Sequence, residues 1–233
     1  MGKRLRNINV ENDFSKSFSL EEAVDIAIKT ATTKFVETID ICMNLNIDPK
    51  NGEQNIRGKV KLPKSLGKNV KVCVFASDDK QQEAKSKDAK DAGADIVGAD
   101  DLIEKIKGGD LNFEKLICTP SMMIKLSKLG KVLGPKGLMP NPKLGTVTED
   151  VKKAVKDAKS GQVEIRNDKD GNIGVSIGKK SFNDENLIKN YKAILETLEK
   201  EKSNVSVKGE LIKSVFITST MGVSYKLKLE KSF

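Results

Sequence analysis

Four consecutive residues near the C-terminus, Ser219, Thr220, Met221 and Gly222, combine two hydroxyl groups, a flexible thioether and a glycine. Small hydroxyl groups hydrogen-bond to ribose 2′-OH groups and to phosphates, and a methionine side chain lies flat on a base or a sugar. Gly222 lets another backbone approach closely. This segment is therefore a candidate RNA-contact site, although the same residue types also make an ordinary hairpin turn.

A cation beside an aromatic ring is a second candidate for contact with nucleic acid. Lys34 and Phe35 are adjacent, a pairing that suits phosphate contact combined with base or ribose stacking. Because aromatic residues make up only 4% of the chain, Phe35 is equally suited to the core of a sheet. Further donors and acceptors, which are also typical of solvated turns, lie at a predicted strand end: Arg166, Asn167, Asp168 and Lys169.

Residues 125–143 form a basic segment that contains five lysines and no acidic residue. Glycines and prolines interrupt it, so we expect a cationic, irregular loop. It looks superficially like a phosphate cradle, but it lacks the Gly-Lys-Ser/Thr spacing of a nucleotide-binding loop. Residues 77–80, which follow a predicted strand, also lack the glycines of a dinucleotide fingerprint. The sequence therefore disfavours a nucleotide-dependent enzyme.

The chain contains no histidine, which removes the commonest general base and the commonest metal ligand. Its three cysteines, Cys42, Cys73 and Cys118, are odd in number and widely spaced, which predicts buried reduced thiols rather than a disulfide or a zinc site. We therefore expect no catalytic residue, no metal and no cofactor. Binding is the favoured class of function.

The charge balance indicates what kind of partner the protein binds. A formal net charge of +9 favours a polyanion. No stretch approaches the roughly 18 to 20 apolar residues of a membrane span, and residues 1–14 lack the apolar core of a secretory signal, so we expect a cytoplasmic protein. The N-terminal basic residues Lys3, Arg4 and Arg6 have no assigned role and also fit a solvated tail.

Alternating patterns predict the elements that position the candidate residues. Ser19 and Glu22 form a capping box for an amphipathic helix over residues 19–31. Period-two alternation predicts a strand over residues 35–47 and an antiparallel partner strand over residues 56–62.

Three strand–helix units begin at residues 70, 94 and 116 and predict a small parallel sheet covered by helices. Alternating strands return near residues 163–177, and a helix over residues 187–198 precedes two last strands at residues 211–218 and 223–229. We expect an α/β protein of two domains: a discontinuous, sandwich-like α+β domain of residues 1–65 and 160–233, with an inserted three-layer, Rossmann-like α/β domain of residues 66–159. Two chain crossings at one boundary predict a hinge.

Residues 131–146 read KVLGPKGLMPNPKLGT, which resembles the signature of the bacterial family of the first protein of the large ribosomal subunit, found in its lateral stalk on the tRNA exit side. The resemblance covers nearly the whole chain. It includes the strand start at Lys34 and Phe35, the strand at residues 55–63, the turn at residues 166–169 and the closing residues 218–222.

The resemblance implies that the discontinuous domain binds large-subunit ribosomal RNA. It also implies that the stalk helps discharged tRNA to leave the exit site, and that the protein represses its own operon mRNA. We expect a ribosomal protein of the cytoplasm that is a monomer off the ribosome. The matching RNA-binding residues are Lys34, Phe35, Thr38, Asn167, Asp168, Lys169, Thr218, Thr220, Met221 and Gly222. We expect Lys131, Lys136 and Lys143 to belong to a mainly structural and electrostatic loop.

Two other classes of function remain open from the residues alone. The first is an enzyme whose inserted parallel sheet binds a nucleotide, and such a protein would bind ATP or NAD. A sequence-independent RNA chaperone would bind any RNA of the same length equally well.

Overall fold

The computed structural model describes residues 4–6, 8, 16–67, 70–76, 87–109, 111–202 and 209–229. The chain forms two compact units, Met1–Leu66 with Val163–Phe233, and Gly67–Gln162. Both contain helices and strands, so the predicted α/β class is confirmed. The sandwich-like and Rossmann-like labels, the domain boundaries and the hinge stay predictions.

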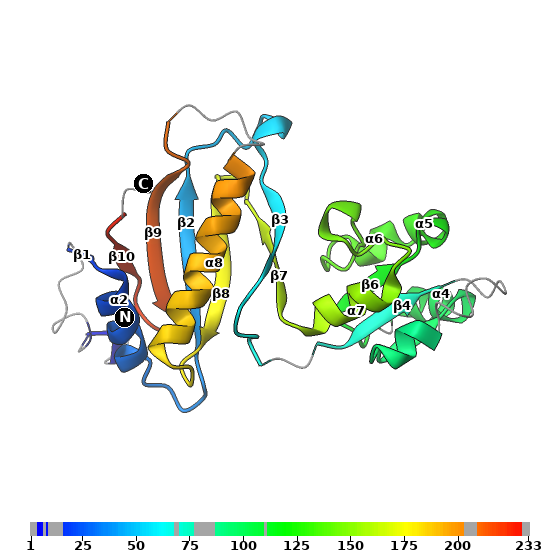
Figure 1. The fold of residues 1–233 in the computed structure, drawn as a ribbon, viewed down its shortest axis with the longest axis horizontal. Helices are drawn as coiled ribbons and strands as arrows, with labels where there is room; N and C mark the ends of the chain where they lie inside the picture. Colours follow the sequence, from blue (N-terminus) through cyan, green and yellow to red (C-terminus); the bar gives the residue numbers. More distant parts are fainter. Residues whose placement is uncertain are drawn as a thin grey trace. The chain divides into compact units, whose positions relative to one another are not determined.

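The first unit is built on a five-stranded sheet to which both ends of the chain contribute (Figure 1). Neighbouring strands are antiparallel except β1, which runs parallel to β10. Their order across the sheet is β1 (Ser17–Phe18), β10 (Tyr225–Leu227), β9 (Ile212–Ser219), β2 (Thr38–Leu45) and β8 (Asn172–Lys179). The last two predicted strands are therefore present as the antiparallel pair β9 and β10.

A second, two-stranded sheet joins β3 (Arg57–Lys61) to β7 (Gln162–Arg166). The prediction that residues 56–62 pair with residues 35–47 is wrong. Both edges of β2 are already hydrogen-bonded, one to β8 and the other to β9, so β2 has no free edge for β3. The short helix η1 (Gly52–Gln54) lies in the connection between β2 and β3.

Two helices cover one face of the five-stranded sheet. Helix α2 (Leu20–Thr30) begins at the predicted capping box, in which Ser19 accepts from the Glu22 amide and Glu22 accepts from the Ser19 amide. Helix α8 (Asp184–Lys202) lies alongside it in one shared core (Figure 1). The strands contribute alternate residues to this core, and β2 supplies Ile39, Ile41, Met43 and Leu45.

The second unit has a parallel sheet with helices on both faces. The strand order is β5 (Ile96–Gly98), β4 (Val72–Phe75) and β6 (Lys115–Cys118). One core joins the sheet to α4 (Asp100–Lys107), α5 (Pro120–Ser127) and α6 (Gly130–Leu133), and the other joins it to α7 (Val151–Lys159) and to the helical residues 87–91. The short helix η2 (Pro142–Leu144) precedes α7.

The cysteines are only partly as predicted. Cys73 and Cys118 are buried, and burial raises the pKa of their thiols to about 12 and about 11, so both stay protonated and unreactive. Cys42 is exposed, contrary to the prediction, because it lies at an outward position of β2. Residues 77–80, where the dinucleotide fingerprint was sought, lie outside the described residues.

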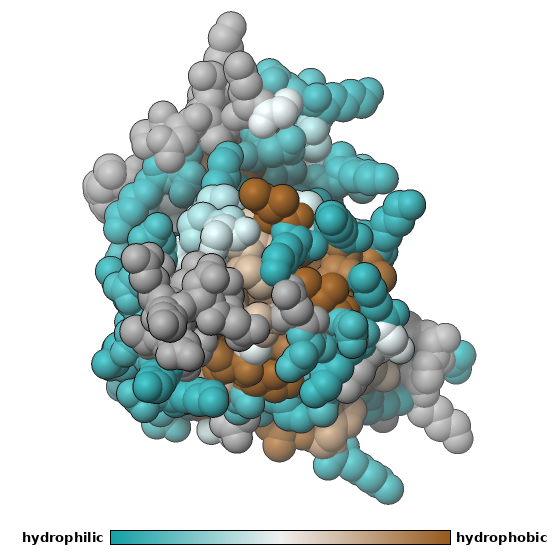
Figure 2. All heavy atoms as spheres, turned by 90° about the vertical axis from the view of Figure 1, so that its right-hand side faces the viewer, coloured by the Kyte–Doolittle hydropathy of each residue, from teal (hydrophilic) through white to brown (hydrophobic). Residues whose placement is uncertain are grey.

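Polar residues dominate the surface that Figure 2 presents, with hydrophobic residues in smaller groups between them. Among the described residues, no helix is both long and apolar enough to cross a membrane. No group of three or more potential metal-ligating side chains occurs within the same described ranges.

Candidate nucleic-acid interface

The face of the five-stranded sheet that points away from α2 and α8 is polar. Strand register places its outward residues in rows, and one row consists of Thr218, Asp40 and Ser176. The Ser176 hydroxyl donates to an Asp40 carboxylate oxygen at 2.6 Å. The side-chain NH₂ group of Asn44 donates to the side-chain oxygen of Asn172 at 2.7 Å. These bonds restrain the side chains that form them, so this part of the face is preorganised. We call it the polar sheet face.

A middle row of this face carries an aromatic ring. Phe216 of β9 lies beside Cys42 of β2 and Lys226 of β10, and Gly174 of β8 is the further neighbour of Cys42. Phe216 is partly exposed, whereas Cys42, Gly174 and Lys226 are exposed. A partly exposed ring beside a lysine on a sheet face suits the stacking of an unpaired base together with phosphate contact.

At one end of the polar sheet face, β9 ends at Ser219 and residues 220–224 lead to β10. We call residues 219–222 the closing loop. Thr220 is hydrogen-bonded to the first residue of β2: its hydroxyl accepts from the Thr38 amide at 2.9 Å, and its own amide donates to the Thr38 carbonyl at 3.0 Å. The Thr220 hydroxyl therefore ties together two segments that are far apart in the sequence, a role not predicted from the sequence.

Glu37 lies under the closing loop and was also missed. Its side chain is fully buried, and its carboxylate accepts from the Met221 amide at 3.0 Å and from the Thr33 amide at 3.1 Å. Burial opposes ionisation, but the hydrogen bonds from Met221 and Thr33 outweigh it and hold the pKa of Glu37 below its ordinary value. The sequence did contain a signal: the acidic Glu37 lies in the alternating series with Ile39 and Ile41, whose side chains point into the core.

The two segments that Glu37 connects carry exposed apolar side chains. Phe35 is 52% exposed, Val36 58% and Met221 53%. The alternative in which Phe35 is a core residue is therefore wrong, because β2 begins only at Thr38 and Phe35 lies in the loop before it. Lys34 is exposed beside Phe35. Apolar surfaces next to a cation are thus presented at this end of the sheet, as stacking on RNA requires.

Position 222 leaves little space for a side chain, which favours glycine. A Cβ atom at this position would lie 2.2 Å from the Ser219 hydroxyl oxygen, and Ser219 is itself buried. Any side chain here would therefore displace the buried Ser219 hydroxyl. Thr218, on the outward side of β9, donates its hydroxyl to the Ser219 carbonyl at 3.1 Å.

The turn that contains Asn167, Asp168 and Lys169 lies at the opposite end of β2. Here the Leu45 amide donates to the Gly171 carbonyl at 3.0 Å. An eight-residue strand spans about 23 Å between its ends. The predicted site residues therefore fall into two groups, one at each end of the polar sheet face.

Two of the three turn residues organise the turn itself. Asn167 accepts from the Ile56 amide at 2.9 Å, and Asp168 accepts from the Asn172 amide at 2.7 Å and the Asp170 amide at 2.9 Å. The bond from the Asn172 amide is the main cause of the lowered pKa of Asp168. Lys169 is exposed. Beside this turn is an open cavity of about 640 Å³, lined by Pro49, Asn55, Ile56, Arg57, Arg166, Asn167, Asp168 and Lys169.

The segment of residues 131–146 lies in the second unit and is more ordered than the expected irregular loop, because it includes most of α6 and all of η2. Leu133 and Leu144 are buried, and the Thr146 hydroxyl accepts from the Asn141 amide at 2.7 Å. Lys131, Lys136 and Lys143 are exposed. Apolar contacts and backbone bonds thus set the path of this segment, and its lysines project from it.

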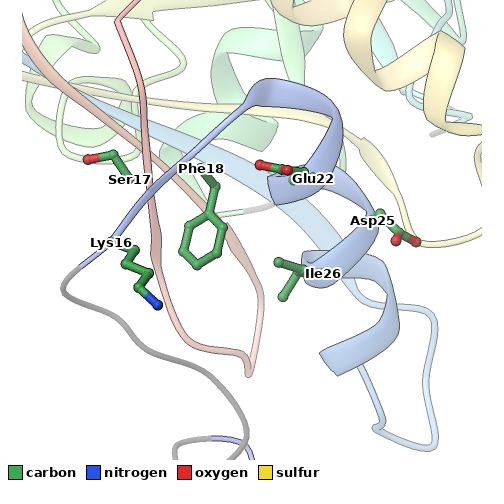
Figure 3. Close-up of a pocket in the computed structure, with 6 residues that line it drawn as sticks. All are labelled: Lys16, Ser17, Phe18, Glu22, Asp25 and Ile26. Carbon is green, nitrogen blue, oxygen red and sulfur yellow. The ribbon is translucent and has the colours of Figure 1, made fainter.

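A further pocket, of about 450 Å³, lies between β1 and α2 (Figure 3). Phe18 and Ile26 give it apolar walls, but its two carboxylates already have partners. Glu22 belongs to the capping box, and Asp25 forms an ion pair with Lys29 at 2.6 Å. Both carboxylates of this pocket are therefore already engaged within α2 and its cap.

A basic chain, a polar sheet face and exposed apolar and cationic groups at its end are features of the nucleic-acid-binding class of proteins. Comparison with known proteins gives the family. Residues 27–223 match the ribosomal protein L1p/L10e family. Over 213 residues the chain is 65% identical to the large ribosomal subunit protein uL1 of Pelagibacter ubique (strain HTCC1062), and the match covers 91% of each chain.

The chain therefore belongs to the ribosomal protein L1 family, as the resemblance of residues 131–146 predicted. Members of this family are structural proteins, so the protein is not an enzyme, and the alternative of a nucleotide-dependent enzyme is set aside.

Proposed function

We propose that the protein is a component of the large ribosomal subunit in the cytoplasm and binds ribosomal RNA at its lateral stalk through the polar sheet face. Family membership supports this proposal, as does the printed name of the Pelagibacter relative. The observation that carries it furthest is the closing loop, whose backbone is hydrogen-bonded to Glu37 and Thr38, while the side chains of Met221, Phe35 and Val36 are exposed.

The proposed contact surface has three parts. Lys34, Phe35 and Met221 would contact phosphate, sugar or base at one end, and Lys169 would contact phosphate at the other. Between them the polar sheet face would read the shape of a folded RNA through Thr38, Thr218 and their neighbours. Asn167, Asp168 and Thr220 would act mainly by holding backbone in place, since their side chains already have partners.

The test of this proposal is the affinity of the whole protein for an rRNA fragment of the large-subunit stalk, compared with an unrelated folded RNA of the same length. Shape recognition predicts tighter binding to the stalk fragment at every salt concentration. Equal affinity for both RNAs would instead support a sequence-independent RNA chaperone and refute the proposed function.

The contribution of Lys34 is measured by the salt dependence of binding. Each lysine–phosphate contact adds roughly one unit to the slope of log K against log salt, so Lys34→Ala should lower that slope by about one. Lys192→Ala is the matched control, because Lys192 is exposed on α8, which packs on the opposite face of the sheet. An identical slope for both variants would remove Lys34 from the contact surface.

Lys131, Lys136 and Lys143 are expected to contribute little to binding of the stalk fragment. They lie in the second unit, and the segment that carries them is held by its buried leucines and backbone bonds. Replacing all three with alanine should leave the salt slope for the stalk fragment unchanged. A slope lowered by roughly three units would place these lysines in the rRNA interface instead.

The resemblance suggests two further roles, which we include in the proposal. The stalk would assist the release of discharged tRNA from the exit site, with the basic second unit as a second RNA contact. The protein would also repress its own operon by binding an mRNA copy of the ribosomal site. Competition between that mRNA leader and the stalk fragment tests the second role, because a shared surface requires mutually exclusive binding.

A further inference from the structure

Arg4 contacts the two loops that form one end of the polar sheet face. Its guanidinium group donates to the Met221 carbonyl, and a second nitrogen of the same group donates to the Thr32 hydroxyl at 3.4 Å. Thr32 lies two residues before Lys34. Arg4 therefore bridges the N-terminal segment, the loop that carries Phe35 and the closing loop.

We propose that Arg4 is a positioning residue of the RNA-binding site, which together with Glu37 clamps the backbone of Met221 and adds positive charge beside it. This inference rests on the proposed function, because the clamp matters for binding only if Met221 contacts RNA. It assigns a role to one member of the N-terminal basic stretch.

The clamp acts on both polar groups of one residue. Glu37 accepts from the Met221 amide at 3.0 Å, and Arg4 donates to the Met221 carbonyl. Both partners are ionic groups, and hydrogen bonds to charged groups are stronger than those between neutral groups. The backbone of Met221 is therefore restrained on both sides, which fixes the direction in which its exposed side chain leaves the loop.

A restrained loop lowers the conformational entropy that binding must remove. If Met221 sampled many orientations in the free protein, ordering it against a base would oppose part of the contact energy. Because of the clamp, the Met221 backbone is already ordered in the free protein, before RNA binds.

Arg4 also has the charge and the spare donors for phosphate contact. A guanidinium group carries five N–H donors, and the two contacts with described residues use only part of them. Within the described residues Arg4 forms no ion pair with a carboxylate, and it is partly exposed. Its charge is therefore not neutralised by those residues.

The test uses the full-length protein with Arg4→Ala and Arg4→Lys. Arg6→Ala is the matched control, because Arg6 lies in the same segment and is exposed. Two quantities are measured: hydrogen exchange of the Met221 amide in the free protein, and affinity for the stalk rRNA fragment over a salt series. The hydrogen exchange rate tests for the clamp in the absence of RNA, and the affinity shows what the clamp contributes to RNA binding.

We expect Arg4→Ala to speed exchange of the Met221 amide, to weaken binding about tenfold and to lower the salt slope by about one unit. Arg4→Lys should restore the slope but not the protection, because an ammonium group lacks the planar fork that bridges two acceptors. Arg6→Ala should leave the exchange unchanged and bind more tightly than Arg4→Ala.

If Arg4→Ala and Arg6→Ala bound the stalk fragment with equal affinity, the proposed role of Arg4 in RNA binding would be overturned, whatever the exchange rate of the Met221 amide. Unchanged exchange would overturn the clamp even if affinity fell, since the effect would then be one of charge alone. If the wild-type protein failed to prefer the stalk fragment, the proposed function would fail, and with it the role of Arg4 in RNA binding; the exchange rates would still decide whether the clamp exists.

Discussion

Replacing Met221 with aspartate is expected to weaken binding to the stalk rRNA fragment by a few kcal/mol. Met221 is 53% exposed, and Glu37 joins its loop to the segment that carries the exposed Phe35 and Val36. A side chain stacked on a base contributes about 1 to 3 kcal/mol, and a carboxylate at this position would also repel phosphates. Titration of the fragment at several salt concentrations measures the loss.

The matched control is Ile124→Asp. Ile124 is the most exposed of the large hydrophobic side chains among the described residues, at 75%, and lies on α5 in the second unit. Both substitutions place a carboxylate at an exposed apolar position, where surface changes usually alter stability by no more than about 0.5 kcal/mol. Equal affinities of the two variants for the stalk fragment would show that the closing loop does not contact RNA.

Replacing Glu37 with glutamine is expected to lower both stability and RNA affinity. The carboxylate accepts from two backbone amides, and hydrogen bonds to a charged group contribute about 1.5 to 3 kcal/mol each. Glutamine keeps one acceptor oxygen and adds an NH₂ donor that faces an amide donor. We therefore expect a loss of about 2 to 4 kcal/mol in the free energy of unfolding, measured by urea denaturation.

Glu196→Gln is the control for the loss of one negative charge, since Glu196 is exposed on α8. Equal stability of the two variants would mean that the bonds made by Glu37 contribute no net stability. A normal RNA affinity for Glu37→Gln would separate Glu37 from the binding site even if the protein were less stable.

The stabilisation by Glu37 should depend on pH in a defined direction. Its pKa in the folded protein lies below the ordinary value of 4.5, because the hydrogen bonds from Met221 and Thr33 outweigh the effect of burial. The ionised form is therefore favoured by folding, so the stabilisation is fully present above pH 4.5 and is lost as the pH falls through the folded pKa. The stability difference between wild type and Glu37→Gln should accordingly shrink in acid.

Local chemistry made several elements predictable. The capping box at Ser19 and Glu22 fixed the start of α2, and the hydroxyl and glycine residues at 219–222 marked the connection between β9 and β10. Uninterrupted apolar runs, each followed by a helical pattern, identified the parallel strands β4 and β6. Each of these signals lies within a few residues of the element that it specifies.

Strand partners and buried polar groups were less predictable. Alternation shows which face of a strand is buried but not which strand lies next to it, so β3 was paired with β2 instead of β7. The predicted strand of residues 35–47 began three residues too early, because apolar character alone does not fix the strand limits. Cys42 was expected to be buried because free cysteines are usually core residues, but it lies at an outward position of β2. Glu37 went unnoticed because its partner, the Met221 amide, is 184 residues away in the chain.

The order of the strands in the first sheet also determines when the proposed binding surface comes into existence. Strand β2 is hydrogen-bonded on one side to β8 and on the other to β9, and both are translated only after the whole second unit. During synthesis, β2 therefore cannot be hydrogen-bonded into the sheet until β8 and β9 have been translated. A nascent chain therefore lacks the assembled polar sheet face until β9 and the closing loop have emerged. Under the proposed function, only nearly finished molecules would bind RNA.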